Sequence, residues 1–385
     1  MLNFEFHNPT RIVFGENTVA RLDQLIPGDA RVLILYGGQS AGKNGTLAEV
    51  RAALGMRKQF EFGGIEPNPS YETLLKAIEL VRAENVDFLL AVGGGSIIDG
   101  TKFVAAAVPF AGDPWQILES FGGVVTKALP LGVVLTLPAT GSEMNAGSVI
   151  TRKASKTKAF FNSPYVFPQF SILDPTKTYT LPVRQLANGV VDAFTHVVEQ
   201  YLTYPVDARV QDRFAEGLLQ TLIEIGPKVI NEPADYDTRA NLMWTASMAL
   251  NGLIAAGVPQ DWATHLVGHE LTAQFGLDHA QTLAVLLPPM LQARRESKRA
   301  KLLQYAGRVW GIKAGSDNER IDLAIEKTRA FFESLGVKTR LSDYGITADA
   351  IDELVHQLEL HGMTQLGEHQ DVTLDVSRKV YAASL

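Results

Sequence analysis

The first half of the chain alternates short apolar runs with amphipathic stretches. The runs at 31–36, 88–92 and 131–138 are rich in Val, Ile and Leu and lack polar alternation, which is typical of strands buried on both faces. Between two of these runs, residues 71–86 place apolar side chains at helical intervals. This alternation of strand and helix predicts a parallel, doubly wound α/β sheet.

From about Pro182 onward, long helical patterns replace the strand-like runs. They cover residues 184–203, 210–226, 239–257 and 321–336. A polar link bracketed by prolines, at 173–182, separates the two kinds of pattern. Because one hydrophobic core rarely grows beyond about 250 to 300 residues, a chain of 385 residues should contain two cores. We therefore expect an α/β domain at 1–180 and a helical domain at 181–385.

The composition narrows the classes of partner and of chemistry. A net charge of −7 with dispersed basic residues lacks the positive surface that nucleic-acid binding requires. No apolar run reaches the roughly 18 to 20 residues that cross a bilayer, and the start has no signal-peptide pattern, so we expect a soluble, cytoplasmic protein that uses no membrane. The absence of cysteine excludes disulfides, thiolate catalysis and Cys-ligated zinc. Any metal must therefore be bound by nitrogen and oxygen atoms.

A glycine-rich turn follows the apolar run at 88–92. Gly93, Gly94, Gly95 and Ser96 lie between this run and a helical pattern, so the backbone N–H groups of a helix N-terminus could bind a diphosphate there. The third glycine does not stand where the six-residue Rossmann fingerprint needs it. A simple tight turn is the alternative interpretation.

A second glycine turn, Gly37, Gly38, Gln39 and Ser40, follows the run at 31–36. No acidic residue stands there to bind the ribose 2′-hydroxyl of NAD and repel a 2′-phosphate, so the turn favours NADP(H). A simple surface turn is again the alternative. Hydroxyl and amide side chains also gather at 136–145, after another predicted strand, where an α/β sheet holds its ligand crevice, although a capped turn would look the same.

Candidate metal ligands occur in the helical half. Asp192 and His196 are four residues apart, as are His265 and His269, and His279 follows after a turn. On a helix this spacing places both side chains on one face. One carboxylate with imidazole nitrogens suits Fe²⁺ or Zn²⁺. A histidine on an amphipathic helix is also commonly a hydrogen-bonded structural residue, and the spacing leaves open which of the three later histidines are ligands.

Taken together, these motifs resemble the iron-containing alcohol dehydrogenases, and within them the branch of NADPH-dependent aldehyde reductases and butanol dehydrogenases. The resemblance runs along nearly the whole chain. The matching stretches are TRIVFGENT, EPNPSYETL, AVGGGSIIDGTKF, LPATGSEMNAG, NGVVDAFTHVVEQY, GVPQDWATHLVGHELTAQFGLDHAQTLAVLLP and HGMTQLGE. It implies a Rossmann-like α/β N-terminal domain and an all-α C-terminal domain, in a dehydroquinate-synthase-like architecture, with the active site in the cleft between them.

The resemblance also implies a role for individual residues. It places the metal ligands on Asp192, His196, His265 and His279, and His269 near the substrate and nicotinamide. Cofactor contacts fall on Gly38 and Ser40 at the adenosine end, on Gly94, Gly95 and Ser96 with Asp99 at the diphosphate, on Thr136, Thr140 and Asn145, and on Lys158 near the ribose. Ala280, after the last ligand, replaces the glycine of many members, as is common in the aldehyde-reductase branch.

The expected activity is hydride transfer between NADP(H) and small aldehydes or primary alcohols, with the ion polarising the substrate oxygen and His269 handling a proton. The family implies a homodimer. One alternative, a lyase related to dehydroquinate synthase, is disfavoured because no Lys/Arg cluster surrounds the histidines. Another, a non-catalytic nucleotide-binding protein, is disfavoured because all four candidate ligands are present.

Overall fold

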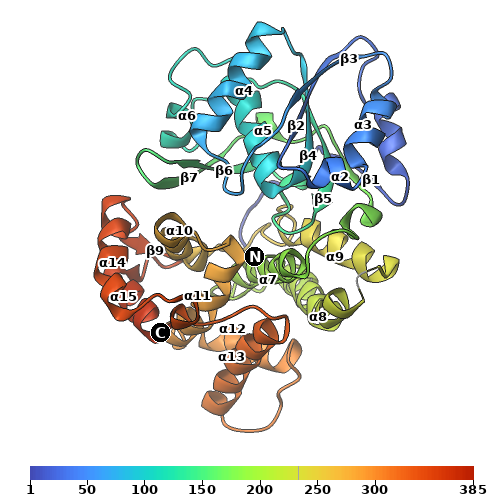
Figure 1. The fold of residues 1–385 in the computed structure, drawn as a ribbon. Coiled ribbons are helices and arrows are strands. Elements are labelled where there is room, and N and C mark those ends of the chain that lie inside the picture. Colours follow the sequence, from blue (N-terminus) through green and yellow to red (C-terminus); the bar gives the residue numbers. More distant parts are fainter. Residues whose placement is uncertain (233) are drawn as a thin grey trace. The chain divides into compact units, whose positions relative to one another are not determined.

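The computed structural model describes residues 1–232 and 234–385 and divides into two compact units (Figure 1). The sheet unit consists of His7–Leu181 and Ala234–Ser247. The helical unit consists of Met1–Phe6, Pro182–Pro233 and Met248–Leu385. The chain therefore passes from one unit to the other several times.

Six parallel strands form the sheet, in the order β1-β8-β5-β4-β2-β3. Their bounds are β1 (Arg11–Phe14), β2 (Arg31–Tyr36), β3 (Lys58–Phe62), β4 (Phe88–Gly94), β5 (Leu131–Leu137) and β8 (Phe170–Leu173). The three predicted strands, β2, β4 and β5, are adjacent in the middle of the sheet, which is why their sequences are continuously apolar. The prediction missed β1, β3 and β8 because two are partly exposed edge strands and β8 has only four residues.

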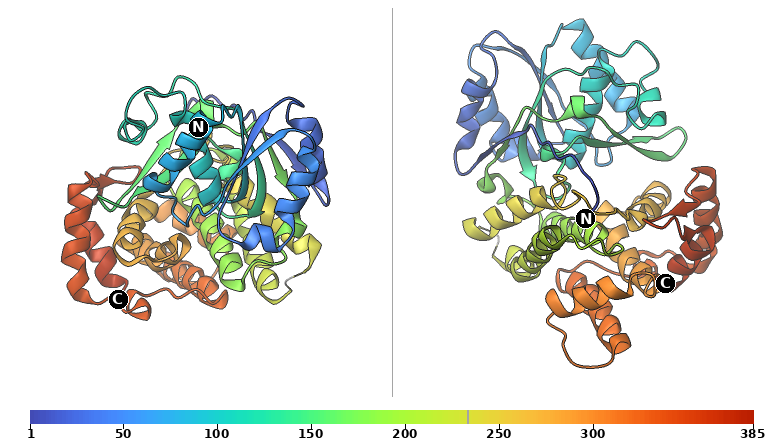
Figure 2. Two further views of the ribbon diagram at one scale, coloured as in Figure 1. Left: turned by 45° about the horizontal axis from the view of Figure 1, so that its top comes forward. Right: turned by 180° about the vertical axis from the view of Figure 1, so that it is seen from behind.

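Successive residues of the central strands enter two different cores. Leu33 of β2 packs with the helices α4 (Tyr71–Ala83) and α5 (Gly95–Ala107), whereas its neighbour Ile34 packs with α3 (Thr46–Leu54). This alternation follows from the two-residue repeat of a strand. Figure 2 shows helices on both sides of the strands. The expected doubly wound α/β sheet is confirmed.

Shorter elements complete the sheet unit. They are η1 (Thr18–Arg21), α1 (Leu22–Leu25), α2 (Ser40–Lys43), α6 (Gln116–Glu119), η2 (Ser142–Met144), η3 (Pro164–Val166), η4 (Pro175–Thr178) and the antiparallel pair β6 (Gly147–Arg152) and β7 (Thr157–Asn162). The helix α9 (Tyr236–Ala249) adds Met243 to one of the two cores. It ends before the predicted limit of 257, because Gly252 and Gly257 both adopt positive φ.

The helical unit is built around α7 (Val183–Tyr201), which is buried on nearly all sides from Leu186 onward. The other long helices are α8 (Arg209–Asn231), α10 (Ala263–Phe275), α11 (His279–Ala293), α12 (Arg299–Arg308), α13 (Asp317–Ser334), α14 (Ile351–Leu360) and α15 (Leu374–Ala383). The remaining elements are η5 (Leu341–Tyr344), η6 (Ala348–Ala350) and the two-stranded β9 (Gln365–Leu366) and β10 (Val372–Thr373). The expected helical C-terminal domain is thus confirmed, and it also contains the two-stranded sheet of β9 and β10. Across the described ranges, every helix is too short or too polar to span a membrane.

Candidate functional site

Three helices of the helical unit supply the predicted metal ligands. Asp192 and His196 project one turn apart from α7 and are 3% and 4% exposed. His265 lies in the first turn of α10, and His279 is the first residue of α11. Gly276 ends α10 in the left-handed conformation with φ of 70°, and Asp278 forms a capping box with Gln281 at the start of α11. This turn reverses the chain and brings His279 beside His265.

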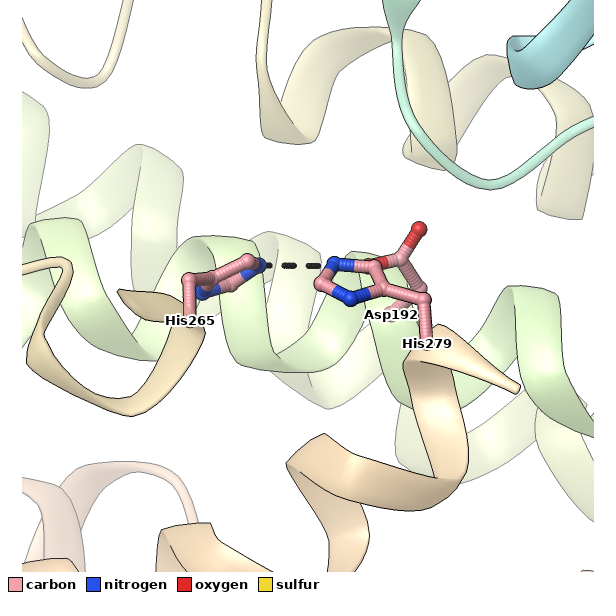
Figure 3. Close-up of side chains that lie close together, drawn as sticks. All are labelled: Asp192, His265 and His279. Carbon is pink, nitrogen blue, oxygen red and sulfur yellow. Dashed lines mark ion pairs between the residues drawn. The ribbon is translucent and has the colours of Figure 1, made fainter. Parts of the chain in front are cut away.

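One carboxylate oxygen faces the Nε2 atoms of three histidines. Asp192 Oδ1 lies 3.5 Å from Nε2 of His196, 3.7 Å from that of His279 and 4.0 Å from that of His265 (Figure 3 draws Asp192 with His265 and His279). These distances exceed the 2.7–3.2 Å of a hydrogen bond. They approach the spacing of about 3.3 Å between ligands of a tetrahedral ion with bonds of about 2.0–2.1 Å. The arrangement therefore fits a bound ion better than direct ion pairs.

The donor atoms of Asp192, His265 and His279 all lie within 4.8 Å of one another, as a metal site requires. His196 is outside this group, although its ring stacks on that of His265 with centroids 4.8 Å apart. Burial lowers the pKa of His196 to about 4, so the imidazole is neutral at pH 7, the form that binds metals. One oxygen and several nitrogen donors suit Fe²⁺ or Zn²⁺ and disfavour Ca²⁺ and Mg²⁺.

His269 lies one turn beyond His265 on α10 and is partly exposed. Its ring centroid is 5.9 Å from that of His279. It is close to the candidate metal group but not among its three members. This position is compatible with the predicted role in proton handling, which stays a prediction.

Glu199 is a residue of this centre that the sequence analysis did not identify. It lies on α7 three residues beyond His196, is 2% exposed, and pairs with Nδ1 of His265. Burial and the nearby Asp261 raise the pKa of Glu199, whereas the N–H donors of Thr264 and His265 lower it. The signal was present in the sequence, because positions 192, 196 and 199 follow one helix face.

The predicted cofactor residues lie in the sheet unit, at the carboxyl ends of adjacent strands. Gly94 caps α5 and Gly95 begins it, directly after β4. A Cβ on Gly95 would come within 2.4 Å of Thr140 Oγ1, so only glycine fits against the segment that follows β5. Ser96, also in the first turn, accepts a hydrogen bond at 3.3 Å from the backbone N–H of Asn68.

The turn at 37–40 lies beside this one. β2 pairs with β4 with Tyr36 opposite Val92, and a Cβ on Gly37 would lie 3.3 Å from Ile97 in the first turn of α5. Gly38 has open space around its Cα, and Ser40 begins the short helix α2. Thr136 stands near the end of β5, the next strand in the sheet. The three predicted cofactor segments thus all lie at the carboxyl ends of the central strands β2, β4 and β5.

A buried polar cluster holds the segment after β5 against α5. Asp99 accepts hydrogen bonds from Ser142 Oγ at 2.6 Å and from the backbone N–H of Val149 at 2.9 Å. Lys102, which the sequence analysis missed, donates to Ser142 Oγ at 2.8 Å and to Asn145 Oδ1 at 3.0 Å. Burial lowers the pKa of Lys102 to about 8.

Lys158 lies on β7 and belongs to the same neighbourhood as Asp99. Burial raises the pKa of Asp99, and the charge of Lys158 is among the influences that lower it. Asp99 and Asn145 thus belong to one buried cluster around Ser142 and Lys102, and the charge of Lys158 acts on Asp99. Their contact with a cofactor stays a prediction.

Both halves of the chain match one family. Residues 9–175 match the family model "Iron-containing alcohol dehydrogenase". Residues 186–383 match "Fe-containing alcohol dehydrogenase family, C-terminal". The matches leave only short segments of the chain uncovered.

Individual relatives are similar over their full length. The NADPH-dependent aldehyde reductase YqhD of Escherichia coli (strain K12) is 62% identical over 386 residues, covering 100% of both chains. The crystal structure of E. coli K-12 YqhD superimposes with a TM-score of 0.99, covering 100% of this chain and 99% of that one. The NADH-dependent butanol dehydrogenase A of Thermotoga maritima is 34% identical, with a TM-score of 0.96 and coverage of 100% and 99%.

Proposed function

We propose that this chain, which belongs to the iron-containing alcohol dehydrogenase family, is a metal-dependent, NADPH-dependent reductase of small aldehydes. The reverse reaction would oxidise primary alcohols. The observation that carries the proposal is the group of Asp192, His265 and His279 on three helices. The 62% identical relative named as an NADPH-dependent aldehyde reductase supports the choice of substrate class.

Four residues would hold the ion: Asp192, His196, His265 and His279. A divalent ion there would act as a Lewis acid and polarise the carbonyl group of the substrate. The chain contributes no cysteine, so both the ligands and the proton donors must be nitrogen and oxygen groups. The donor set suits iron and zinc alike.

The sheet unit would bind the cofactor. The N-terminus of α5, with Gly94, Gly95 and Ser96, offers backbone N–H groups and the positive end of a helix dipole to the diphosphate. The turn from Gly37 to Ser40 carries no carboxylate that would repel a 2′-phosphate, which supports NADP(H) over NAD(H).

Reduction of an aldehyde needs one proton in addition to the hydride. His269 would hold that proton on its imidazole and deliver it to the product oxygen, because histidine titrates near neutral pH. Its ring centroid lies 5.9 Å from that of His279, one of the residues that would hold the ion. A changed pH–rate profile in His269→Ala with unchanged metal content would support this role.

The test combines elemental analysis of the purified protein with NADPH and NADH oxidation against a panel of short aldehydes. We expect about one transition-metal ion per chain. We also expect turnover of several aldehydes, with a higher kcat/KM for NADPH. A protein that holds no transition metal and reduces no aldehyde would contradict the proposal. A strong preference for NADH would contradict the cofactor assignment alone.

A further inference from the structure

Glu199 joins two helices of the helical unit. Its Oε1 accepts a hydrogen bond from the backbone N–H of Thr264 at 2.6 Å. Its Oε2 accepts one from the backbone N–H of His265 at 3.3 Å and also contacts Nδ1 of the same imidazole. The backbone carbonyl of Glu199 accepts from the N–H of Asp261 at 3.1 Å. Both oxygens of a side chain that is 2% exposed are thus directed at the start of α10.

This arrangement replaces an ordinary helix cap. Trp262, the residue before α10, has φ of 64° and makes no side-chain cap hydrogen bond. The first N–H groups of a helix need acceptors, and the helix dipole favours a negative charge at that end. Glu199 supplies this acceptor from α7, 66 positions away from His265. Hydrogen bonds from Glu199 therefore hold the start of α10, which carries His265, against α7, which carries Asp192 and His196.

The contact also decides which nitrogen of His265 can bind a metal. When Nδ1 carries the hydrogen and donates it to a carboxylate, the lone pair is on Nε2. Nε2 is the atom that lies 4.0 Å from Asp192 Oδ1. The stacking of the His265 ring on His196, with an angle of 14° between the planes, fixes the ring in the same orientation.

We propose that Glu199 is a positioning residue of the metal centre, which selects the Nδ1–H tautomer of His265, orients its ring and thereby strengthens metal binding. The proposal rests on the proposed function, because it presumes that the centre binds an ion. It adds a residue that acts through a ligand without being one.

The decisive variant is Glu199→Gln, which keeps the size of the side chain but replaces one accepting oxygen with an amide group. Since the two oxygens face three N–H donors, the amide must oppose at least one of them. Glu216→Gln is the matched control. Glu216 is also a buried carboxylate of the helical unit, 6% exposed, but it accepts from Tyr201 at 3.0 Å and Gln304 at 2.8 Å instead of a histidine.

The measurement is the affinity of each chelator-stripped protein for Zn²⁺ and Co²⁺, determined by competition with a chromophoric chelator. The absorption spectrum of bound Co²⁺ reports the geometry of its ligands. Glu199→Gln should weaken the affinity about 10- to 100-fold and shift the Co²⁺ spectrum. Glu216→Gln should lower the melting temperature of the metal-free protein while leaving affinity and spectrum unchanged. If Glu199→Gln does not fold, Glu199→Asp takes its place, with the same expectation because its carboxylate falls short of Nδ1.

Three outcomes would overturn the proposal, and they are distinguishable. Unchanged affinity in Glu199→Gln, in a protein whose wild type binds metal and reduces aldehydes, removes the role of Glu199 and leaves the proposed function intact. Equal losses of affinity in Glu199→Gln and Glu216→Gln mean that general destabilisation is the cause. A wild-type protein that binds neither ion and reduces no aldehyde removes both proposals together.

Discussion

At the residue scale, Asp192 is the centre of the candidate metal site. A carboxylate that is 3% exposed loses most of its hydration, which costs several kcal/mol unless other groups compensate. Three imidazole Nε2 atoms at 3.5–4.0 Å surround its Oδ1. A divalent ion bound among these donors would compensate the buried negative charge. The burial of Asp192 therefore fits its assignment as a metal ligand.

Substituting Asp192 tests this argument. In Asp192→Asn the bound transition metal should fall well below one per chain, and kcat/KM for aldehyde reduction should fall by at least about 100-fold, because an amide is a poor metal ligand. Elemental analysis and NADPH oxidation provide the two readouts. His356→Ala, which removes an exposed histidine of α14, is the control and should change neither. Full metal content in Asp192→Asn would count against the assigned ligand set.

Gly95 is a second residue whose identity the packing explains. Its missing side chain allows the backbone to approach Thr140, where a Cβ would come within 2.4 Å of Oγ1. Gly95→Ala should therefore destabilise the protein by about 1–3 kcal/mol and raise the KM for NADPH. Gly28→Ala, at an exposed glycine with open space around it, should do neither.

A double variant separates the clash from other effects of Gly95→Ala. Thr140→Ala removes the atoms that the new Cβ would meet, so Gly95→Ala in that background should cost less than it does in the wild type. Urea denaturation measures the coupling. Strictly additive free energies of unfolding would show that the contact with Thr140 is not the cause.

At the element scale, the ends of α10 and α11 determine where the ligands lie. α10 begins against Glu199 and ends at Gly276, and α11 begins at the capping box of Asp278. Asp278 also accepts a hydrogen bond at 2.8 Å from Asn188 of α7. This hydrogen bond holds the start of α11 against α7. His279 is therefore held close to the helix that carries Asp192.

Removal of this cap should weaken the binding of the metal ion. Asp278→Ala should lower the free energy of unfolding by about 0.5–2 kcal/mol and should also weaken metal binding, since His279 is the next residue. Ser316→Ala removes the equivalent capping box from α13 and should cause a similar loss of stability without loss of metal affinity. Equal metal affinities in the two variants would show that the cap does not position His279.

At the scale of the whole molecule, each unit has its own hydrophobic core. The sheet unit contains one core on each face of its sheet, and the helical unit buries residues of α10, α11, α14 and α15 together. The first six residues belong to the helical unit, whereas residues 234–247 belong to the sheet unit. Because the chain passes between the units more than once, a cut near residue 181 would leave both with missing parts.

The stability of the protein should depend on pH through Glu66 of the sheet unit. Burial opposes its ionisation, but hydrogen bonds from Lys153, Ser70 and Thr73 outweigh that effect and lower its pKa to about 2, from an ordinary value of 4.5. A carboxyl group whose pKa is lower in the folded state stabilises the protein above its unfolded pKa. That contribution is lost as the pH falls from about 4.5 towards 2.

The measurement is the urea midpoint of the wild type and of Glu66→Gln at about pH 6 and about pH 3. The wild type should be the more stable of the two at the higher pH, and the difference should shrink at the lower pH. Glu84→Gln, on an exposed pair with Arg31, is the control and should show a much smaller change. A difference that grows on acidification would contradict the lowered pKa of Glu66.

Much of the fold followed from local patterns. Strands β2, β4 and β5 were predictable because a strand buried on both faces must be continuously apolar, and α7 because its ligands and apolar residues repeat with the helical period. The edge strand β3 was not predictable, because its alternating residues look like an exposed loop. The limit of α9 was misplaced because the apolar pattern continues past the glycines that end the helix.

The fold class, the family and the residue types that can bind a metal without cysteine could all be read from the order of amino acids along the chain. Which of those residues meet depends on how the helices pack. Spacing on one helix relates Asp192 to His196, but the approach of His265 and His279 depends on how α10 and α11 pack against α7. The roles of Glu199 and Lys102 emerged in the same way, because a buried polar side chain is defined by partners that lie far away in the sequence. The spacing of apolar residues along the chain predicts that a side chain is buried. Its neighbours can be identified only from the contacts in the folded structure.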